Sequence, residues 1–175
     1  MYLSVQENTD IPTLCKKLEK LPYVIYAEPD YYRKTVDAPA PDDPIFVQQH
    51  GWEQGNDRDI DLLRAWDFTR GSNNVIVGVL DGGIDYHNPD LGNGAFGAGA
   101  KVAGGYDYAD NDSNPDDTGL DSHGSAVAGI IGAFANNATG VAGIAGGDGT
   151  TGNPGVQLIS LRIGNDAGKS KWEMK

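Results

Sequence analysis

Two residues in this chain of 175, Asp81 and His123, are the strongest candidates for chemistry. Asp81 directly follows the apolar run 75–80, which is typical of a strand buried on both faces of a parallel sheet. His123 begins a helix predicted over 123–135, and the amino end of a helix favours a neutral imidazole. A carboxylate accepting from Nδ1–H would fix the tautomer and leave Nε2 free to take a proton. The pair therefore indicates nucleophilic catalysis with His123 as the general base, although alone Asp81 also fits a turn and His123 a surface position.

The elements that must position this pair predict an α/β fold. Residues 75–80 and 156–163 have the continuous apolar pattern of buried strands, and the helix over 123–135 is expected between them. Residues 86–122 are rich in Gly, Asp and Asn, so they are expected to be mostly loop. Strands that alternate with helices predict a doubly wound, mostly parallel sheet, whose ligands bind beyond the carboxyl ends of the strands. Asp81 is expected at such an end.

The front of the chain is expected to form a separate piece. Residues 2–6 and 23–27 have strand-like patterns, and Asp10 can cap a helix that follows it. The proline-containing segment that comes next suits an extended linker. We therefore expect a small α/β piece, a linker and a main domain, at residues 1–36, 37–44 and 45–175.

Charge and composition argue against several classes of function. The formal net charge is −12 and the sequence pI is about 4.4, which does not suit a protein that binds nucleic-acid phosphates. The longest nearly apolar run, 126–135, is about half of what spans a bilayer, and the sequence as given begins without a secretory signal. A match to the dinucleotide-binding pattern GxGxxG at 92–97 follows a turn rather than a strand. We therefore expect no nucleic acid, membrane or organic cofactor as a partner.

Two motifs carry a resemblance to a known family. Residues 77–85 (VGVLDGGID), followed by 87–91 (HNPDL), resemble the aspartate motif of the subtilisin-like serine proteases, the subtilases of peptidase family S8. Residues 121–129 (DSHGSAVAG) resemble their histidine motif, and the order of Asp first and His 42 residues later also fits. The similarity runs from about residue 44 to 168. It implies a subtilisin-like fold, and it implies a serine endopeptidase that hydrolyses peptide bonds with an Asp/His/Ser triad.

The chain departs from this family pattern at several positions. Gly82 stands where the family usually has Ser or Thr, and the lost hydroxyl is expected to loosen the hydrogen bonds that support Asp81. None of the serines after His123 lies in the Gly-Thr-Ser-Met-Ala-like setting of the nucleophile, and the oxyanion-hole Asn is also unmatched; these serines are Ser125, Ser160 and Ser170. We therefore expect the chain alone to be inactive. The alternative is a non-catalytic relic, or a binding or inhibitory module that calcium could stabilise.

The front piece also resembles part of the family. Residues 21–31 (LPYVIYAEPDY) are similar to the end of the inhibitory propeptide, the I9-like inhibitor that subtilases carry before the catalytic domain. The resemblance implies that residues 1–36 are a partial propeptide, which would act as an intramolecular inhibitor. It further implies polypeptide substrates and secretion from the cell.

Two acidic regions resemble calcium sites. Residues 110–117 (DNDSNPDD) match the first positions of an EF-hand loop, but Pro115 replaces the required glycine and the terminal Glu is missing, so an EF-hand is not expected. The same stretch resembles an acidic loop that binds calcium in some subtilases, with a solvated turn as the alternative. A second site, again by resemblance, combines an aspartate with a loop at 136–141. The candidate ligands are Asp110, Asp112 and Asp116 in the first region and Asp90, Asn137 and Val141 in the second.

Overall fold

The computed structural model describes residues 5–6, 9–29, 38–56, 58–117 and 122–164. The chain divides into two compact units, Met1–Thr35 and Val36–Lys175. The domain boundaries expected from the sequence stay a prediction, because residues 30–37 lie outside the described part.

The first unit contains helix α1 (Ile11–Leu18). Asp10 caps it by accepting a hydrogen bond from the Thr13 backbone N–H (3.2 Å), and Pro12 is tolerated in the first turn, where no backbone donor is needed. The strand expected at 23–27 is not formed, and Ile25 is 98% exposed. A strand is stabilised by hydrogen bonds to a neighbouring strand, and none of the described segments pairs with residues 23–27. The other expected strand, at 2–6, lies mostly outside the described residues.

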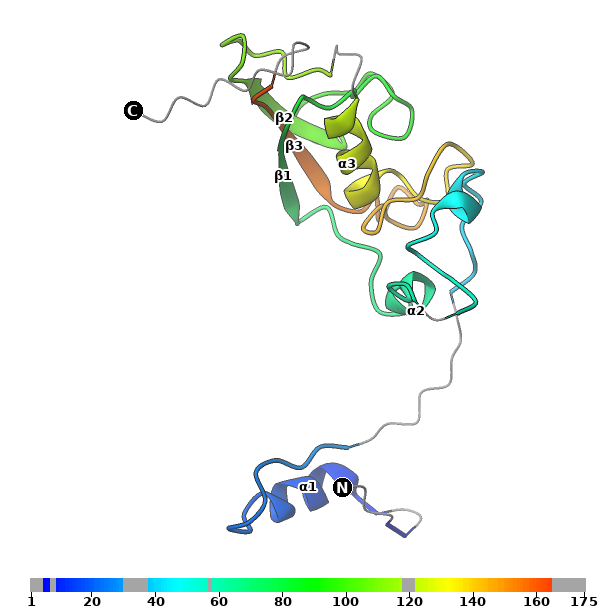
Figure 1. Cartoon of the computed structure of the whole chain (residues 1–175), viewed down its shortest axis with the longest axis vertical. Helices are drawn as coiled ribbons and strands as arrows, with labels where there is room; N and C mark the ends of the chain where they lie inside the picture. The colour runs from blue at the N-terminus through cyan, green and yellow to red at the C-terminus, as the bar shows by residue number, and fades with distance from the viewer. Residues whose placement is uncertain (1–4, 7–8, 30–37, 57, 118–121, 165–175) are drawn as a thin grey trace. The chain divides into compact units, whose positions relative to one another are not determined.

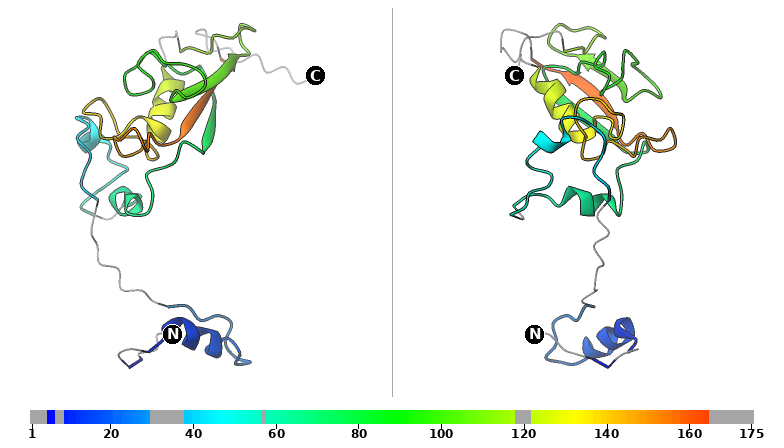
Figure 2. Two further views of the ribbon diagram at one scale, coloured as in Figure 1. Left: turned by 180° about the vertical axis from the view of Figure 1, so that it is seen from behind. Right: turned by 90° about the vertical axis from the view of Figure 1, so that its right-hand side faces the viewer.

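The second unit is built on a parallel three-stranded sheet (Figure 1). Its strands are β1 (Ile76–Asp81), β2 (Val102–Asp107) and β3 (Gln157–Arg162), in the order β1-β3-β2. Helix α3 (His123–Gly132) packs against β1 and β3, and the two views of Figure 2 show it lying along the sheet. The expected α/β fold with a parallel sheet is therefore confirmed, and α3 is three residues shorter than expected.

Strand β2 was not expected from the sequence, which predicts mostly loop in this region. Its sequence VAGGYD contains two glycines, and glycine is depleted in strands. The structure explains why one of them is needed. A Cβ atom at Gly105 would lie only 2.1 Å from the Ser160 backbone oxygen and 2.8 Å from Pro115 Cγ. Close approach of a neighbouring backbone therefore overrides the low strand propensity of glycine here.

The apolar core lies partly between the sheet and α3. It includes Val79 of β1, Leu158 of β3 and Ala128 of α3, all buried. A second buried cluster joins the short helix η1 (Phe46–Gln48) to α2 (Leu62–Trp66), and Trp66 Nε1 donates to the Ile144 carbonyl oxygen at 2.8 Å. Within the described residues, no helix has the length and apolar character needed to cross a bilayer.

Candidate active site

Asp81 is the last residue of β1, at the carboxyl edge of the sheet. Its Oδ1 atom accepts a hydrogen bond from the Gly82 backbone N–H at 2.7 Å. Its backbone oxygen accepts from the Ile163 N–H at 2.8 Å and from the Gly164 N–H at 3.4 Å, just after β3. The end of β3 therefore fixes the backbone that carries this carboxylate.

His123 is the first residue of α3, and Ser122 before it has a left-handed backbone conformation with φ 45°. The next residue, Gly124, lets the helix start very close to the end of β1. A Cβ atom at position 124 would lie 2.2 Å from the Gly83 backbone oxygen and 3.0 Å from Asp81 Cβ. Only glycine permits this approach, in agreement with the close backbone packing that the small residues after His123 predict.

The two side chains meet directly. His123 Nδ1 lies 2.8 Å from Asp81 Oδ2, and the two side chains are 66% and 22% exposed. With the carboxylate as acceptor, the proton is assigned to Nδ1, and this tautomer leaves Nε2 as the acceptor on the imidazole. The contact between the two side chains agrees with the geometry expected from the sequence, and the role of His123 as a general base stays a prediction.

The two glycines after Asp81 differ in their surroundings. Gly83 has φ 115° and lies against the Asp116 backbone, where a Cβ would be 2.8 Å from the carbonyl oxygen. A Cβ at Gly82 would meet nothing within 4 Å, and its φ is not positive. The fold therefore does not require glycine at 82, and the Ser or Thr usual at this position would fit.

The described serines that follow His123 have other partners. Ser125 Oγ donates to Asp117 Oδ2 (2.5 Å) and accepts from the Asp85 N–H (2.9 Å). Ser160 is buried in β3, and its hydroxyl donates to the Pro115 carbonyl oxygen at 2.8 Å. Ser170 lies outside the described residues. Neither described serine is placed as a nucleophile for His123.

The candidate ligand Asp90 lies against the loop 136–141, as the resemblance implies. Its buried carboxylate accepts from Asn137 Nδ2 (2.9 Å) and from the Val141 backbone N–H (2.8 Å). Val141 therefore approaches Asp90 with its backbone N–H, and a role as a cation ligand, which would use its carbonyl oxygen, stays a prediction. Burial raises the pKa of Asp90, against the opposing effect of these two hydrogen bonds.

A second buried carboxylate at this loop, Asp43, is missing from the sequence-based ligand set. It accepts from the backbone N–H groups of Asn136 (2.7 Å) and Asn137 (3.4 Å). Burial raises its pKa most, and the charges of Asp42 and Asp90 add to this rise. The sequence placed Asp43 in a linker, and its position beside Asp42 and before Pro44 gave only a turn signal.

The structure does not bring Asp110, Asp112 and Asp116 together as ligands. Asp110 forms an ion pair with Arg162 (2.6 Å), and Asp116 lies 3.4 Å from His87 Nε2. Asp112 Oδ1 accepts from a backbone N–H nearby. No cluster of three acidic, His or Cys side chains suited to a metal occurs in the described part of the chain.

The sequence of the chain matches known proteins. Residues 72–175 match the model of the Subtilase family. The chain is 40% identical over 153 residues to the thermophilic serine proteinase of Bacillus sp. (strain AK1), a match that covers 87% of this chain and 32% of that protein. It is 34% identical over 133 residues to thermitase of Thermoactinomyces vulgaris, covering 75% of this chain and 39% of thermitase. The chain thus spans about a third of the first relative and about two fifths of the second.

Solved structures show the same similarity. The serine protease of Aeromonas sobria aligns with a TM-score of 0.57 and 25% identity, over 81% of this chain and 24% of that one. A protease of Pseudoalteromonas arctica PAMC 21717 aligns with a TM-score of 0.53 and 27% identity, over 75% of this chain and 41% of that one. The family match covers more than half of the sequence and includes both Asp81 and His123, so this chain belongs to the subtilase family.

Proposed function

We propose that the chain supplies the Asp and His of a serine endopeptidase that cleaves polypeptides. One observation carries this proposal: Asp81 and His123, far apart in the sequence, meet at 2.8 Å at the carboxyl edge of the sheet. Family membership supports it, because the known relatives include serine proteases.

In this mechanism Asp81 holds the Nδ1–H of His123 and stabilises the imidazolium that forms during the reaction. His123 Nε2 takes the proton of a serine hydroxyl while Oγ attacks the peptide carbonyl carbon. The imidazolium then gives this proton to the leaving amine, and water hydrolyses the acyl-enzyme. The side chains that the structure describes perform the orientation and the proton transfer.

The nucleophilic serine is proposed to lie outside these 175 residues. The hydroxyls of Ser125 and Ser160 are already engaged with other groups, which supports this view. Without the serine and the oxyanion donors the chain is expected to be inactive, since one such donor alone typically contributes about 10²–10³ in rate.

A fluorophosphonate probe tests this proposal. We expect no labelling of the 175-residue chain, and we expect a reading frame continuing past codon 175 to encode a Gly-Thr-Ser motif. The longer product should be labelled, and His123→Ala should abolish its labelling. Labelling of Ser125 or Ser160 in the chain itself would contradict the assignment. A stop codon directly after Lys175 would favour the alternative, a non-catalytic binding or inhibitory module.

We also propose a structural calcium ion at the loop 136–141. The donor chemistry fits, because two buried carboxylates, Asp43 and Asp90, converge on this loop, and calcium prefers oxygen ligands. Asn137 would supply its amide oxygen only after its side-chain amide turns, because this oxygen accepts from the Thr139 N–H while Nδ2 donates to Asp90. A bound cation would offset the burial that raises the pKa of both aspartates.

Thermal unfolding in calcium or in a chelator tests this site. We expect calcium to raise the melting temperature of the wild-type chain, and we expect Asp90→Asn to abolish the rise. Asp110→Asn is the control, because Asp110 is bound to Arg162 and should leave the calcium response intact. An equal response in all three proteins would remove the site from consideration.

The propeptide and the secretion that the family resemblance implies are also proposals. Residues 1–36 are proposed to be a partial inhibitory propeptide that is cleaved within residues 36–41. Secretion is proposed because a relative from Natrialba magadii, 34% identical over 120 residues, is named a halolysin-like extracellular serine protease.

A further inference from the structure

Three charged residues stand in one row at the carboxyl edge of the sheet. The strand register pairs Asp81 of β1 with Arg162 of β3, and Arg162 with Asp107 of β2. Arg162 and Asp107 are buried, in contrast to the exposed His123 that Asp81 contacts. Arg162, in the middle of the row, therefore lies between Asp81 of the candidate active site and the buried carboxylate of Asp107.

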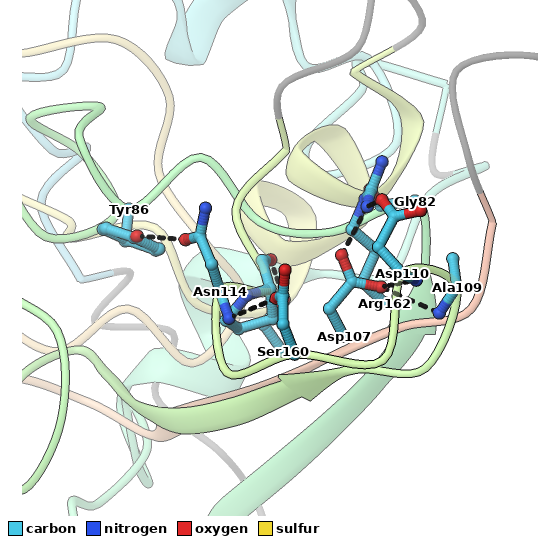
Figure 3. Close-up of polar contacts among 10 residues, drawn as sticks. Gly82, Tyr86, Asp107, Ala109, Asp110, Asn114, Ser160 and Arg162 are labelled. Carbon is cyan, nitrogen blue, oxygen red and sulfur yellow. Dashed lines mark hydrogen bonds and ion pairs between the residues drawn. The ribbon is translucent and has the colours of Figure 1, made fainter.

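Two carboxylates hold the guanidinium of Arg162. Its Nη1 atom donates to Asp107 Oδ2 and to Asp110 Oδ2, the latter at 2.6 Å (Figure 3). Burial lowers the pKa of Arg162, but the bonds to Asp110 and Asp107 outweigh this and leave it above its ordinary value. The guanidinium is therefore a fixed charge, and its planar fork sets the direction of the remaining donors.

The third contact of Arg162 reaches the turn after Asp81. Its Nε–H donates to the Gly82 carbonyl oxygen at 3.2 Å, and Figure 3 shows the two residues side by side. The peptide unit between Gly82 and Gly83 accepts this bond. The unit between Asp81 and Gly82 donates its N–H to Asp81 Oδ1. Gly82 has no side chain to restrict its backbone dihedral angles. The hydrogen bond from Arg162 to its carbonyl oxygen restricts them instead.

Arg162 also holds the loop that leads toward His123. Asp107 and Asp110 lie at the start of this loop, and the Tyr108 N–H donates to the Arg162 carbonyl oxygen at 2.7 Å. The same residue thus contacts the backbone just after β1, at Gly82, and just after β2, at Tyr108.

We infer that Arg162 is a positioning residue for the Asp81–His123 pair, acting through the Gly82 carbonyl. The inference rests on the proposed function, because it gives Arg162 a role only if Asp81 orients His123. A purely structural ion pair is the competing explanation, and the two differ in which atom of residue 162 matters. The ion pair requires Nη1, whereas the positioning role requires the donor at Nε.

Two variants separate these roles. Arg162→Gln places an amide N–H the same number of bonds from Cα as Nε, so it can still donate to Gly82. Arg162→Met has a stem of similar length and no donor. Both variants lose the ion pairs with Asp107 and Asp110, so both should lose a similar amount of thermal stability.

The readout is the Nδ1 proton of His123, followed by NMR in the full chain labelled with ¹⁵N-histidine. We expect slow exchange with water in the wild type and in Arg162→Gln, and exchange at least about tenfold faster in Arg162→Met. Equal exchange rates in the two variants would overturn the inference. If both variants unfold, Asp107→Asn is added to each of them, because it removes the carboxylate that has lost its partner. The Nδ1 exchange rates of the two double variants are then compared by the same criterion.

Asp81→Ala, which removes the acceptor altogether, separates failure of this inference from failure of the proposed function. If the protected Nδ1 proton survives in Asp81→Ala, the Asp81–His123 pair itself is wrong. If Asp81→Ala abolishes the protection while Arg162→Gln and Arg162→Met do not differ, only the role of Arg162 is wrong.

Discussion

Two carboxylate contacts at the same sheet edge differ in their exposure to solvent. The side chains of Asp81 and His123 are 22% and 66% exposed, whereas those of Asp107 and Arg162 are 2% and 6% exposed. Breaking a buried ion pair leaves an unpaired charge away from water, but an exposed pair is replaced by hydration. This edge of the sheet therefore holds a buried pair that anchors the backbone and a second pair whose imidazole is exposed and available for chemistry.

The largest expected effect is the loss of the buried pair. Asp107→Ala removes the buried one of the two counter-charges of Arg162, leaving only the exposed Asp110, and it removes the acceptor for the Ala109 and Asp110 N–H groups. We expect the free energy of unfolding to fall by about 3–5 kcal/mol, measured by urea unfolding. Asp110→Ala is the control, because its side chain is mostly exposed and its loss should cost about 1 kcal/mol or less. Equal losses in both variants would contradict the comparison.

One buried charge, that of Lys101, has no carboxylate partner within the described residues, so it differs from the buried Arg162–Asp107 pair. Lys101 directly precedes β2, at the end opposite to Asp107, and its Nζ donates to the carbonyl oxygens of Pro154 and Val156. The ammonium also lies 4.4 Å from the ring centre of Phe134. Burial lowers the pKa of Lys101 from 10.5 to about 8.

This lowered pKa makes stability depend on pH. Between pH 8 and 10.5 the unfolded chain binds a proton at Lys101 that the folded chain has released, so the folded state gains stability as the pH rises. The gain is about 3 kcal/mol across this window. Urea unfolding at pH 7, 8, 9 and 10.5 measures it. Lys101→Met should remove this rise, whereas Lys20→Met, at an exposed position, should retain it.

The exposed pair depends on a close approach between backbones, which Gly124→Ala tests. The new Cβ would lie 2.2 Å from the Gly83 oxygen, so the start of α3 must move away from β1. We expect a loss of about 1–3 kcal/mol in stability and loss of the protected Nδ1 proton of His123.

Gly129→Ala on the same helix is the matched control. Its Cβ would meet only Val141 Cγ2 at 3.7 Å, an ordinary contact, and alanine favours a helix over glycine. This variant should be as stable as the wild type or more stable, with the His123 signal unchanged. A similar loss of the signal in both variants would show that glycine at 124 has no special role.

The sequence located the pair but not the contacts that hold it. Asp81 and His123 were found because their motifs are local, and strands β1 and β3 were found because their apolar runs are continuous. The small residues after His123 predict that the backbone packs closely there, but the partner of Gly124 and the role of Arg162 depend on which backbones meet in space, and no local pattern carries that information.

The same reasoning explains the incorrect predictions. The strand expected at 23–27 has suitable residue types, but a strand also depends on a pairing partner elsewhere in the chain. Strand β2 was missed for the opposite reason, since its two glycines lower strand propensity while the packing against β3 requires one of them, Gly105. Residues 110–116 have the composition of a ligand loop, but Arg162, distant in sequence, pairs with Asp110.

The smallest expected effect on stability belongs to the exposed pair. Asp81→Asn removes the charge facing His123 but keeps a side chain of the same size, and solvent replaces much of the lost interaction. We expect the free energy of unfolding to change by about 1 kcal/mol or less, similar to Asp61→Asn, which breaks the exposed Arg64–Asp61 ion pair. In a longer product that carries the serine, peptidase activity should fall by about 10⁴-fold. A stability loss as large as that of Asp107→Ala would mean that Asp81, too, is a buried anchor, and the division of this edge into an anchoring and a chemical pair would be wrong.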